Sequence, residues 1–424
     1  MTEARLHYEL AGHRLDNGLE VVVAPDPDAP GVAVNIWVEV GSADEHTGKT
    51  GFAHLFEHLM FQGSASVASG EHMATVEALG GTVNATTSSD RTNYFETVPR
   101  GALDLALWLE ADRFSTLAIT EENFETQRQV VKEEKRQRYD NQPYGDLLEL
   151  LTRQHFQPEH PYGHLTIGSM QDLDDASLGD VSSFFDSWYP ASNLRLVLSG
   201  PVTPDEGIEL TERYFGGLPS TIKPRRAAMP AANPADPSVE VVRRQVPHSL
   251  TYLSWGAPEA ASAQSSALNL ALAVLADGNA SRLHRALVRN ADIANEVHSA
   301  LLPNRSASSI STILGRPSDG VSIEALNAAI LAEVDRFIAE GPTEEEVARA
   351  VAQYERDWLW DLATSSGRAD AINEAWLVHG DPGWVNTHLA DVLAITPDDI
   401  RDAAAAWLSP GAAHELHYLA EGTR

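Results

Sequence analysis

The 424-residue chain has no cysteine, which excludes disulfide bonds and thiolate metal sites. It has no run of about 18 uncharged apolar residues, so we expect no membrane-spanning segment. Residues 1–9 lack the basic start and apolar block of a secretion signal, which favours a cytoplasmic location. Basic residues are also few, with 30 Lys and Arg against 61 Asp and Glu and a net charge of −31. Such a surface repels nucleic acid and anionic lipid, so we expect neither as a partner.

The rest of the composition is that of a globular protein, with 43% apolar residues and a length sufficient for two or three domains. Two similar segments, DVSSFFDSWYP at 180–190 and DIRDAAAAWLS at 399–409, lie about half the chain apart. Their spacing indicates an internal duplication. We predict an α+β fold of two homologous αβ domains, 1–220 and 240–424, joined by a linker rich in proline and alanine at 221–239.

One stretch of the first half, GFAHLFEHLMF at 51–61, has the spacing of an amphipathic helix. His54 and His58 are four residues apart, so one helical turn places both imidazoles on the same side. Two such histidines supply two of the three protein ligands of a catalytic zinc site. Glu57 lies beside them and can act as a general base that takes a proton from water. A bare H-x-x-E-H pattern also arises by chance on surface helices.

A third ligand is predicted from a second helix, which begins after Thr120. Gln127, Val131 and Glu134 fall on one face of this helix by their spacing. Glu134 therefore points where the buried valine points, and a buried carboxylate is costly unless it is paired or bound to a metal. Glu133 is rotated by about 100° from that face. The alternative is that Glu134 is an ordinary exposed acid within the charged run 132–138.

Residues 82–98 are predicted to form two strands, and the first of them, 82–87, is too polar for the centre of a sheet. An edge strand offers unpaired backbone groups that an extended peptide can join by strand addition. An ordinary solvated hairpin explains the same pattern.

Four motifs in order resemble the pitrilysin, or insulysin, family of zinc peptidases, the inverzincins. The similarity is dense in the first half and extends over nearly the whole chain, whose length and duplication are most similar to the mitochondrial-processing-peptidase-like branch. The motifs are GFAHLFEHLMFQGS (51–64), GGTVNATT (80–87), VVKEE (130–134) and HPYGHLTIG (160–168).

The resemblance implies one zinc ion per chain on His54, His58 and Glu134, with Glu57 as the general base. It also implies that the edge strand binds a peptide substrate through the segment Val83, Asn84, Ala85 and Thr86. The two domains would form one half of a clamshell, and a second subunit would supply the other half.

One segment of the second half departs from the family pattern. Self-sufficient homodimers of the family carry an Arg and, seven residues later, a Tyr, where this chain has Val288 and Asn295. Neither side chain replaces an Arg or a phenol as an oxyanion donor, a loss that typically costs about 2.7–4 kcal/mol. We therefore expect a zinc-bearing subunit of a heterodimer, whose partner subunit supplies the Arg/Tyr pair.

The predicted function is a zinc metalloendopeptidase that hydrolyses unstructured peptides. Two alternatives stay open. A peptidase that trims leader peptides or processes precursors has the same chemistry and a narrower substrate. A non-catalytic scaffold subunit has the same fold, although an intact His54, Glu57, His58 and Glu134 argues against it.

Overall fold

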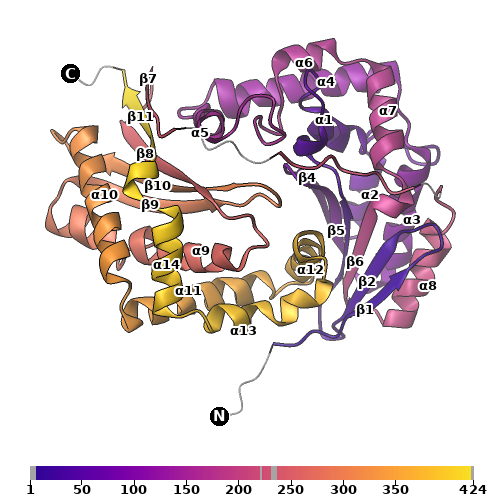
Figure 1. Cartoon of the computed structure of the whole chain (residues 1–424). Coiled ribbons are helices and arrows are strands. Elements are labelled where there is room, and N and C mark those ends of the chain that lie inside the picture. Colours follow the sequence, from indigo (N-terminus) through magenta and orange to yellow (C-terminus); the bar gives the residue numbers. More distant parts are fainter. Residues whose placement is uncertain (1–5, 220–221, 231–235, 422–424) are drawn as a thin grey trace. The chain divides into compact units, whose positions relative to one another are not determined.

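The computed structural model describes residues 6–219, 222–230 and 236–421, which fold into two compact units. The first unit is built from residues up to 135, 165–228 and 357–388, and the second from 136–164, 229–356 and the residues after 388. Each unit has its own sheet and its own helices (Figure 1). The predicted α+β class with two sheet-and-helix domains is confirmed.

The first unit contains a six-stranded sheet in the order β1-β2-β6-β3-β5-β4. Its strands are β1 (Ala11–Arg14), β2 (Glu20–Pro25), β3 (Val32–Val38), β4 (Thr82–Thr87), β5 (Thr92–Val98) and β6 (Leu194–Gly200). Its helices are α1 (Phe52–Leu59), α2 (Glu71–Ala78), α3 (Leu103–Thr116), α4 (Glu121–Lys135), α6 (Met170–Asp175), α7 (Leu178–Trp188), α8 (Pro204–Phe215) and α12 (Ser365–His379). The predicted edge strand 82–87 is confirmed, since β4 lies at the end of this sheet.

The second unit contains a five-stranded sheet in the order β7-β11-β8-β10-β9. Its strands are β7 (Val239–Arg244), β8 (Leu250–Ala257), β9 (Ala294–Leu302), β10 (Ser309–Pro317) and β11 (His414–Ala420). Its helices are α5 (Leu147–His155), α9 (Ala263–Ala276), a π-helical segment (His284–Asn290), α10 (Ile323–Glu340) and α14 (Pro397–Trp407). Two more helices, α11 (Glu344–Asp361) and α13 (His388–Leu393), contain two of the points where the chain passes from one unit to the other.

The two sheets repeat one topology. In the first sheet, β2 pairs parallel with β6, and β6, β3, β5 and β4 follow in antiparallel order. In the second, β7 pairs parallel with β11, and β11, β8, β10 and β9 follow in antiparallel order. The repeated topology agrees with the internal duplication that the sequence indicates.

Each sheet is covered on one face by a helix from the other half of the sequence. In the first unit, Val22 and Val197 of the sheet pack against Ala369 and Ile372 of α12. In the second, Leu416 of β11 packs in one cluster with residues of α5. Each compact unit therefore includes a helix from the other half of the sequence. The predicted linker at 221–239, which the structure describes only in part, remains a prediction.

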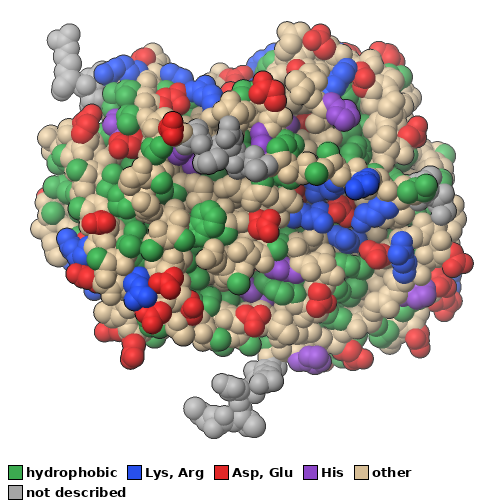
Figure 2. Space-filling model, viewed as in Figure 1, with side chains coloured by type: hydrophobic (Ala, Val, Ile, Leu, Met, Phe, Trp, Pro, Cys, Tyr) green, Lys and Arg blue, Asp and Glu red, His purple; other side chains and the backbone are tan. Residues whose placement is uncertain are grey.

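Acidic side chains are spread over the face seen in Figure 2, and the Lys and Arg that gather on its right-hand side have Asp or Glu among them. Ion pairs of this kind occur where Lys223 lies 2.6 Å from Glu39 and Arg226 lies 2.7 Å from Asp44. Among the described residues, no helix is both long and apolar enough to cross a membrane.

Candidate metal centre and active site

Helix α1 begins at a position that only glycine fits. Gly51 has a φ of +89°, and a Cβ on it would meet the carbonyl oxygen of Ile167 at 2.9 Å. The carboxylate of Glu45 then accepts hydrogen bonds from the backbone N–H groups of Gly51 at 2.9 Å and Ala53 at 2.7 Å. A carboxylate at this end satisfies N–H groups that have no partner within the helix and also favours the helix dipole. The start of the helix is therefore fixed from outside it.

The apolar side of α1 fixes the rotation of the helix. Phe56 is buried and packs against the rings of Phe184 and Phe185 of α7 and of Tyr189. Since helical residues three and four apart share a face, burial of this side leaves His54 and His58 together on another.

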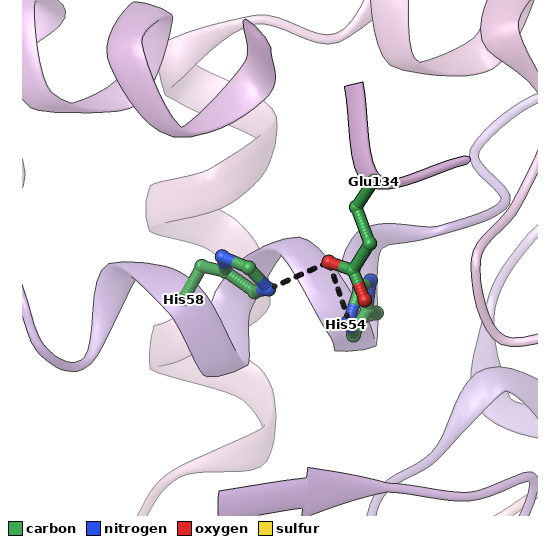
Figure 3. A group of neighbouring side chains, drawn as sticks. All are labelled: His54, His58 and Glu134. Atoms are coloured by element: carbon green, nitrogen blue, oxygen red, sulfur yellow. Dashed lines mark ion pairs between the residues drawn. The ribbon is translucent and has the colours of Figure 1, made fainter. Parts of the chain in front are cut away.

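The structure brings His54, His58 and Glu134 together (Figure 3). The Nε2 atoms of His54 and His58 lie 3.7 and 3.3 Å from the same Oε2 atom of Glu134. The three side chains are 12, 22 and 16% exposed, so the cluster is partly shielded but open to solvent. Burial lowers the pKa of His58, but the hydrogen bond and charge of Glu134 more than offset this, and the pKa is raised.

Helix α4 presents Glu134 as its spacing predicts. Gln127 and Val131 are buried, and Glu134 on the same face is partly buried, whereas Glu133 is exposed. Arg128 holds this helix against the end of α6 by donating to the carbonyl oxygens of Asp174 and Ala176. The distal carboxylate is thus carried by an anchored helix rather than by a mobile loop.

The donor set fits zinc. A tetrahedral zinc site with bonds of about 2.0–2.1 Å places its ligand atoms roughly 3.3–3.5 Å apart. The two Nε2-to-Oε2 distances, 3.3 and 3.7 Å, are close to that spacing. Two imidazoles and one carboxylate are also a usual protein set of a catalytic zinc site, which keeps a further position open.

Glu57 lies on the same helix between the two histidines and contacts a residue of β4. The hydroxyl of Thr87 donates to Oε2 of Glu57 at 2.5 Å. Burial raises the pKa of the Glu57 carboxyl, and the Thr87 hydrogen bond opposes that rise. A carboxyl whose pKa is raised in this way is a stronger base than an exposed one once it is ionised.

Among the described residues, only β5 pairs with β4, so one edge of β4 is free, and backbone hydrogen bonds identify the residues that face this edge. The N–H of Ala85 is bonded to Oδ1 of the preceding Asn84 at 2.9 Å rather than to β5. Because strand residues alternate in direction, Val83, Ala85 and Thr87 present their backbone groups to the free edge, and Asn84 and Thr86 face β5. A peptide carbonyl that binds at Ala85 therefore has to displace the Asn84 amide oxygen.

A second cluster of the same side-chain types lies deeper in the first unit and was not anticipated from the sequence. Nε2 of His72 lies 3.4 Å from Oε2 of Glu96 and 3.6 Å from Oε1 of Glu110. All three side chains are at most 6% exposed, and Arg113 holds Glu110 through two hydrogen bonds. Burial and the charge of Arg113 lower the pKa of His72 to about 2, and burial and the charge of Glu110 raise that of Glu96.

The segment of the second unit that departs from the expected Arg/Tyr pattern has structural contacts instead. Val288 packs against the core of the second unit. Asn295, at the start of β9, donates from its side chain to the carbonyl oxygen of Pro317 at 2.9 Å. Neither residue offers the guanidinium or phenol that the pattern would require.

The fold and the site are those of a class of two-domain, peptidase-like chains. In this class the first domain carries a donor set of two histidines and a glutamate, with a second glutamate beside it. The model of the insulinase family (peptidase family M16) matches residues 20–166, and the model of the peptidase M16 inactive domain matches residues 175–354. The chain belongs to the M16 family.

Known proteins of similar sequence and structure agree with this family. The zinc protease PqqE of Helicobacter pylori is 30% identical over 374 residues, which cover 87% of this chain and 83% of that protein. The crystal structure of a protease from H. pylori superposes with a TM-score of 0.90 at 26% identity and covers 98% of this chain and all of that one. A peptidase M16 inactive domain from Pseudomonas fluorescens has a TM-score of 0.87 at 14% identity, covers 97% of each chain, and shares the fold.

Proposed function

We propose that the chain is the zinc-bearing subunit of a metalloendopeptidase that hydrolyses unstructured peptides, with one zinc ion per chain. The observation that carries this proposal is the convergence of His54, His58 and Glu134 with Glu57 beside them on α1. Family membership and relatives named zinc proteases support the reaction class.

The zinc ion and the side chains have separate roles in the proposed hydrolysis. Zinc, when bound, supplies a Lewis acid that polarises a carbonyl group and lowers the pKa of water. Glu57 accepts the proton of the attacking water and passes it to the leaving amine, which are the two roles of a general acid–base group. The Thr87 hydrogen bond keeps one carboxylate oxygen of Glu57 on the side of β4.

The substrate is held as an added strand along β4. The backbone groups of Val83, Ala85 and Thr87 at the free edge bind the peptide main chain, whereas the backbone groups of Asn84 and Thr86 face β5. Main-chain hydrogen bonds give affinity with little dependence on sequence, so an extended, unfolded peptide is the expected substrate class.

The oxyanion donors come from a heterologous partner subunit. The support is the contacts of Val288 and Asn295, which are engaged within the second unit and lack the necessary groups. A purified chain that cleaves peptides alone at the full rate of its complex would overturn this part of the proposal.

A non-catalytic subunit of the same fold is the second candidate. It is favoured by the match of the second half to an inactive domain and by Val288 and Asn295. A peptidase that processes precursors or leader peptides differs from the first proposal only in its substrate.

Glu57→Gln tests the proposed function against the scaffold. Zinc content should stay at about one ion per chain, and kcat should fall roughly 10²–10⁴-fold, the usual contribution of a general base. Exposed Glu133→Gln is the matched control and should keep both zinc and turnover. A wild-type protein without zinc, or full activity in Glu57→Gln, would remove the peptidase proposal.

A further inference from the structure

The contact between Thr87 and Glu57 joins two parts of the first unit that have different tasks. Glu57 belongs to the helix of the paired histidines, and Thr87 is the last residue of the edge strand β4. The Thr87 hydroxyl donates to Oε2 of Glu57 at 2.5 Å. An ionised carboxylate only accepts hydrogen bonds, so the hydroxyl is oriented toward the form of Glu57 that acts as a base.

Thr87 itself is held from several directions. Across the sheet it pairs with Thr92, whose hydroxyl donates to the carbonyl oxygen of Val40 at 3.0 Å. The turn that follows is closed by Ser88, whose N–H donates to the carbonyl oxygen of Arg91 at 2.8 Å. The carbonyl oxygen of Ser88 in turn accepts from the N–H of Ser42 at 3.1 Å. The hydroxyl of Thr87 is therefore presented by a braced hairpin end.

The backbone and the side chain of Thr87 face two different groups. By the alternation of β4, its N–H and C=O lie at the free edge, while its side chain points to α1. A peptide added to this edge is thus placed in register by the residue that also fixes the base. Two torsions of a glutamate side chain, χ1 and χ2, have several staggered minima, so without such a contact the carboxylate distributes over more than one position.

We propose that Thr87 is a positioning residue that holds the Glu57 carboxylate in register with a peptide bound on β4. The proposal rests on the proposed peptidase function and deepens it. Thr87 acts through Glu57 and through the strand, and its hydroxyl forms no bond to the reacting atoms. Misplacement of a reacting group by about 1 Å can cost about 10²-fold in rate, which sets the scale of the expected effect.

Thr87→Val, which keeps the shape and removes the hydroxyl, is the decisive variant. In the complex with the partner subunit, assayed with an internally quenched peptide, kcat should fall about 10- to 100-fold while KM and the zinc content stay unchanged. Thr87→Ser restores a hydroxyl and should recover kcat to within about threefold of wild type. If Thr87→Val turns over like wild type, or if Thr87→Ser is as slow as Thr87→Val, the hydroxyl does not position the base.

Thr92→Val is the matched control, since it removes a hydroxyl from the cross-strand neighbour that donates to Val40 rather than to Glu57. It should lower stability and reduce kcat far less than Thr87→Val does, because it removes no hydrogen bond to Glu57. An equal loss of kcat in Thr92→Val would assign the effect to a loosened hairpin and overturn the proposal.

Crystal structures of the zinc-loaded wild type and Thr87→Val give a readout that does not depend on turnover. Glu57 should occupy one conformer toward β4 in the wild type and more than one, or a shifted one, in the variant. An unchanged Glu57 conformer in Thr87→Val would overturn the positioning role, even if peptide hydrolysis were absent. A wild type that stays inactive even in complex with its partner subunit, but shows the expected shift of Glu57 in Thr87→Val, would count against the proposed function and leave the positioning role supported.

Discussion

The first unit contains two clusters built from the same side-chain types, and they differ in what balances their charge. His54, His58 and Glu134 are 12–22% exposed and face solvent. In the other cluster, His72, Glu96 and Glu110 are at most 6% exposed, and the guanidinium of Arg113 already occupies both oxygens of Glu110. The donor atoms are similarly spaced in both, so spacing alone does not make a metal centre.

A metal centre needs more than correctly spaced ligands. A cation in the buried cluster would lie beside a guanidinium that is packed 4.7 Å from the ring centres of Phe61 and Tyr94. Burial and the charge of Glu110 also raise the pKa of Glu96, and a protonated carboxyl is a poor metal ligand. We therefore interpret the open cluster as the zinc centre and the buried one as part of the scaffold that holds β5 to α2 and α3.

The largest effect is expected on zinc affinity, which should depend on the open cluster and not on the buried one. Glu134→Gln removes a charged ligand atom and should weaken zinc binding by more than the roughly 10- to 100-fold that is typical of outer-shell partners, with loss of peptidase activity. Zinc titration against a competing chelator measures it. Glu133→Gln, on the exposed neighbour, should bind zinc as the wild type does; equal weakening in both variants would mean that Glu134 is not a ligand.

The second effect is on stability and concerns the buried cluster. Arg113→Met leaves Glu110 buried without its cation and should lower the free energy of unfolding by about 3–5 kcal/mol. Zinc content should remain at about one ion per folded chain. Arg100→Met, which breaks an exposed pair with Glu206, is the control and should cost at most about 1 kcal/mol. A large loss of zinc in Arg113→Met would break the distinction between the clusters.

The smallest expected effect is the contribution of His72 to the pH dependence of the free energy of unfolding. The unfolded chain binds a proton at this histidine below about pH 6.5, whereas the folded chain, with a pKa of about 2, does not. His72 therefore makes the wild type less stable as the pH falls below 6.5, by at most about 1.4 kcal/mol per unit.

Denaturant unfolding between pH 5 and pH 8 measures this contribution as the difference between wild type and His72→Gln. The difference should be constant above about pH 7 and should change below it, with the wild type losing more stability in acid. His7→Gln, on an exposed histidine, controls for the substitution itself. Parallel curves for wild type and His72→Gln would show that folding does not lower the pKa of His72, contrary to the effect expected from its burial and from Arg113.

Local patterns in the sequence predicted the open cluster because each of its parts has a local signature. The spacing of His54 and His58 and the buried stripe of Gln127, Val131 and Glu134 each follow from helix periodicity. The edge position of 82–87 followed from its polarity. Thr87 could have been singled out by the same alternation, since it is two residues beyond Ala85 on the face that meets α1.

The buried cluster had no such signature. Glu110 and Arg113, three residues apart on α3, have the pattern of an ordinary surface ion pair, and His72 and Glu96 come from two other elements. Only the tertiary packing of α2, β5 and α3 brings them together. The exchange of α5 and α12 between the sequence halves could likewise not be predicted, because the residues that a helix buries do not specify which sheet it covers.

An anomalous-difference map at the zinc absorption edge, from crystals of the zinc-containing protein, shows directly which cluster binds zinc. We expect one peak per chain, in contact with His54, His58 and Glu134, and no peak beside His72. A chain without a peak at the first position, or with one at His72, would contradict the account.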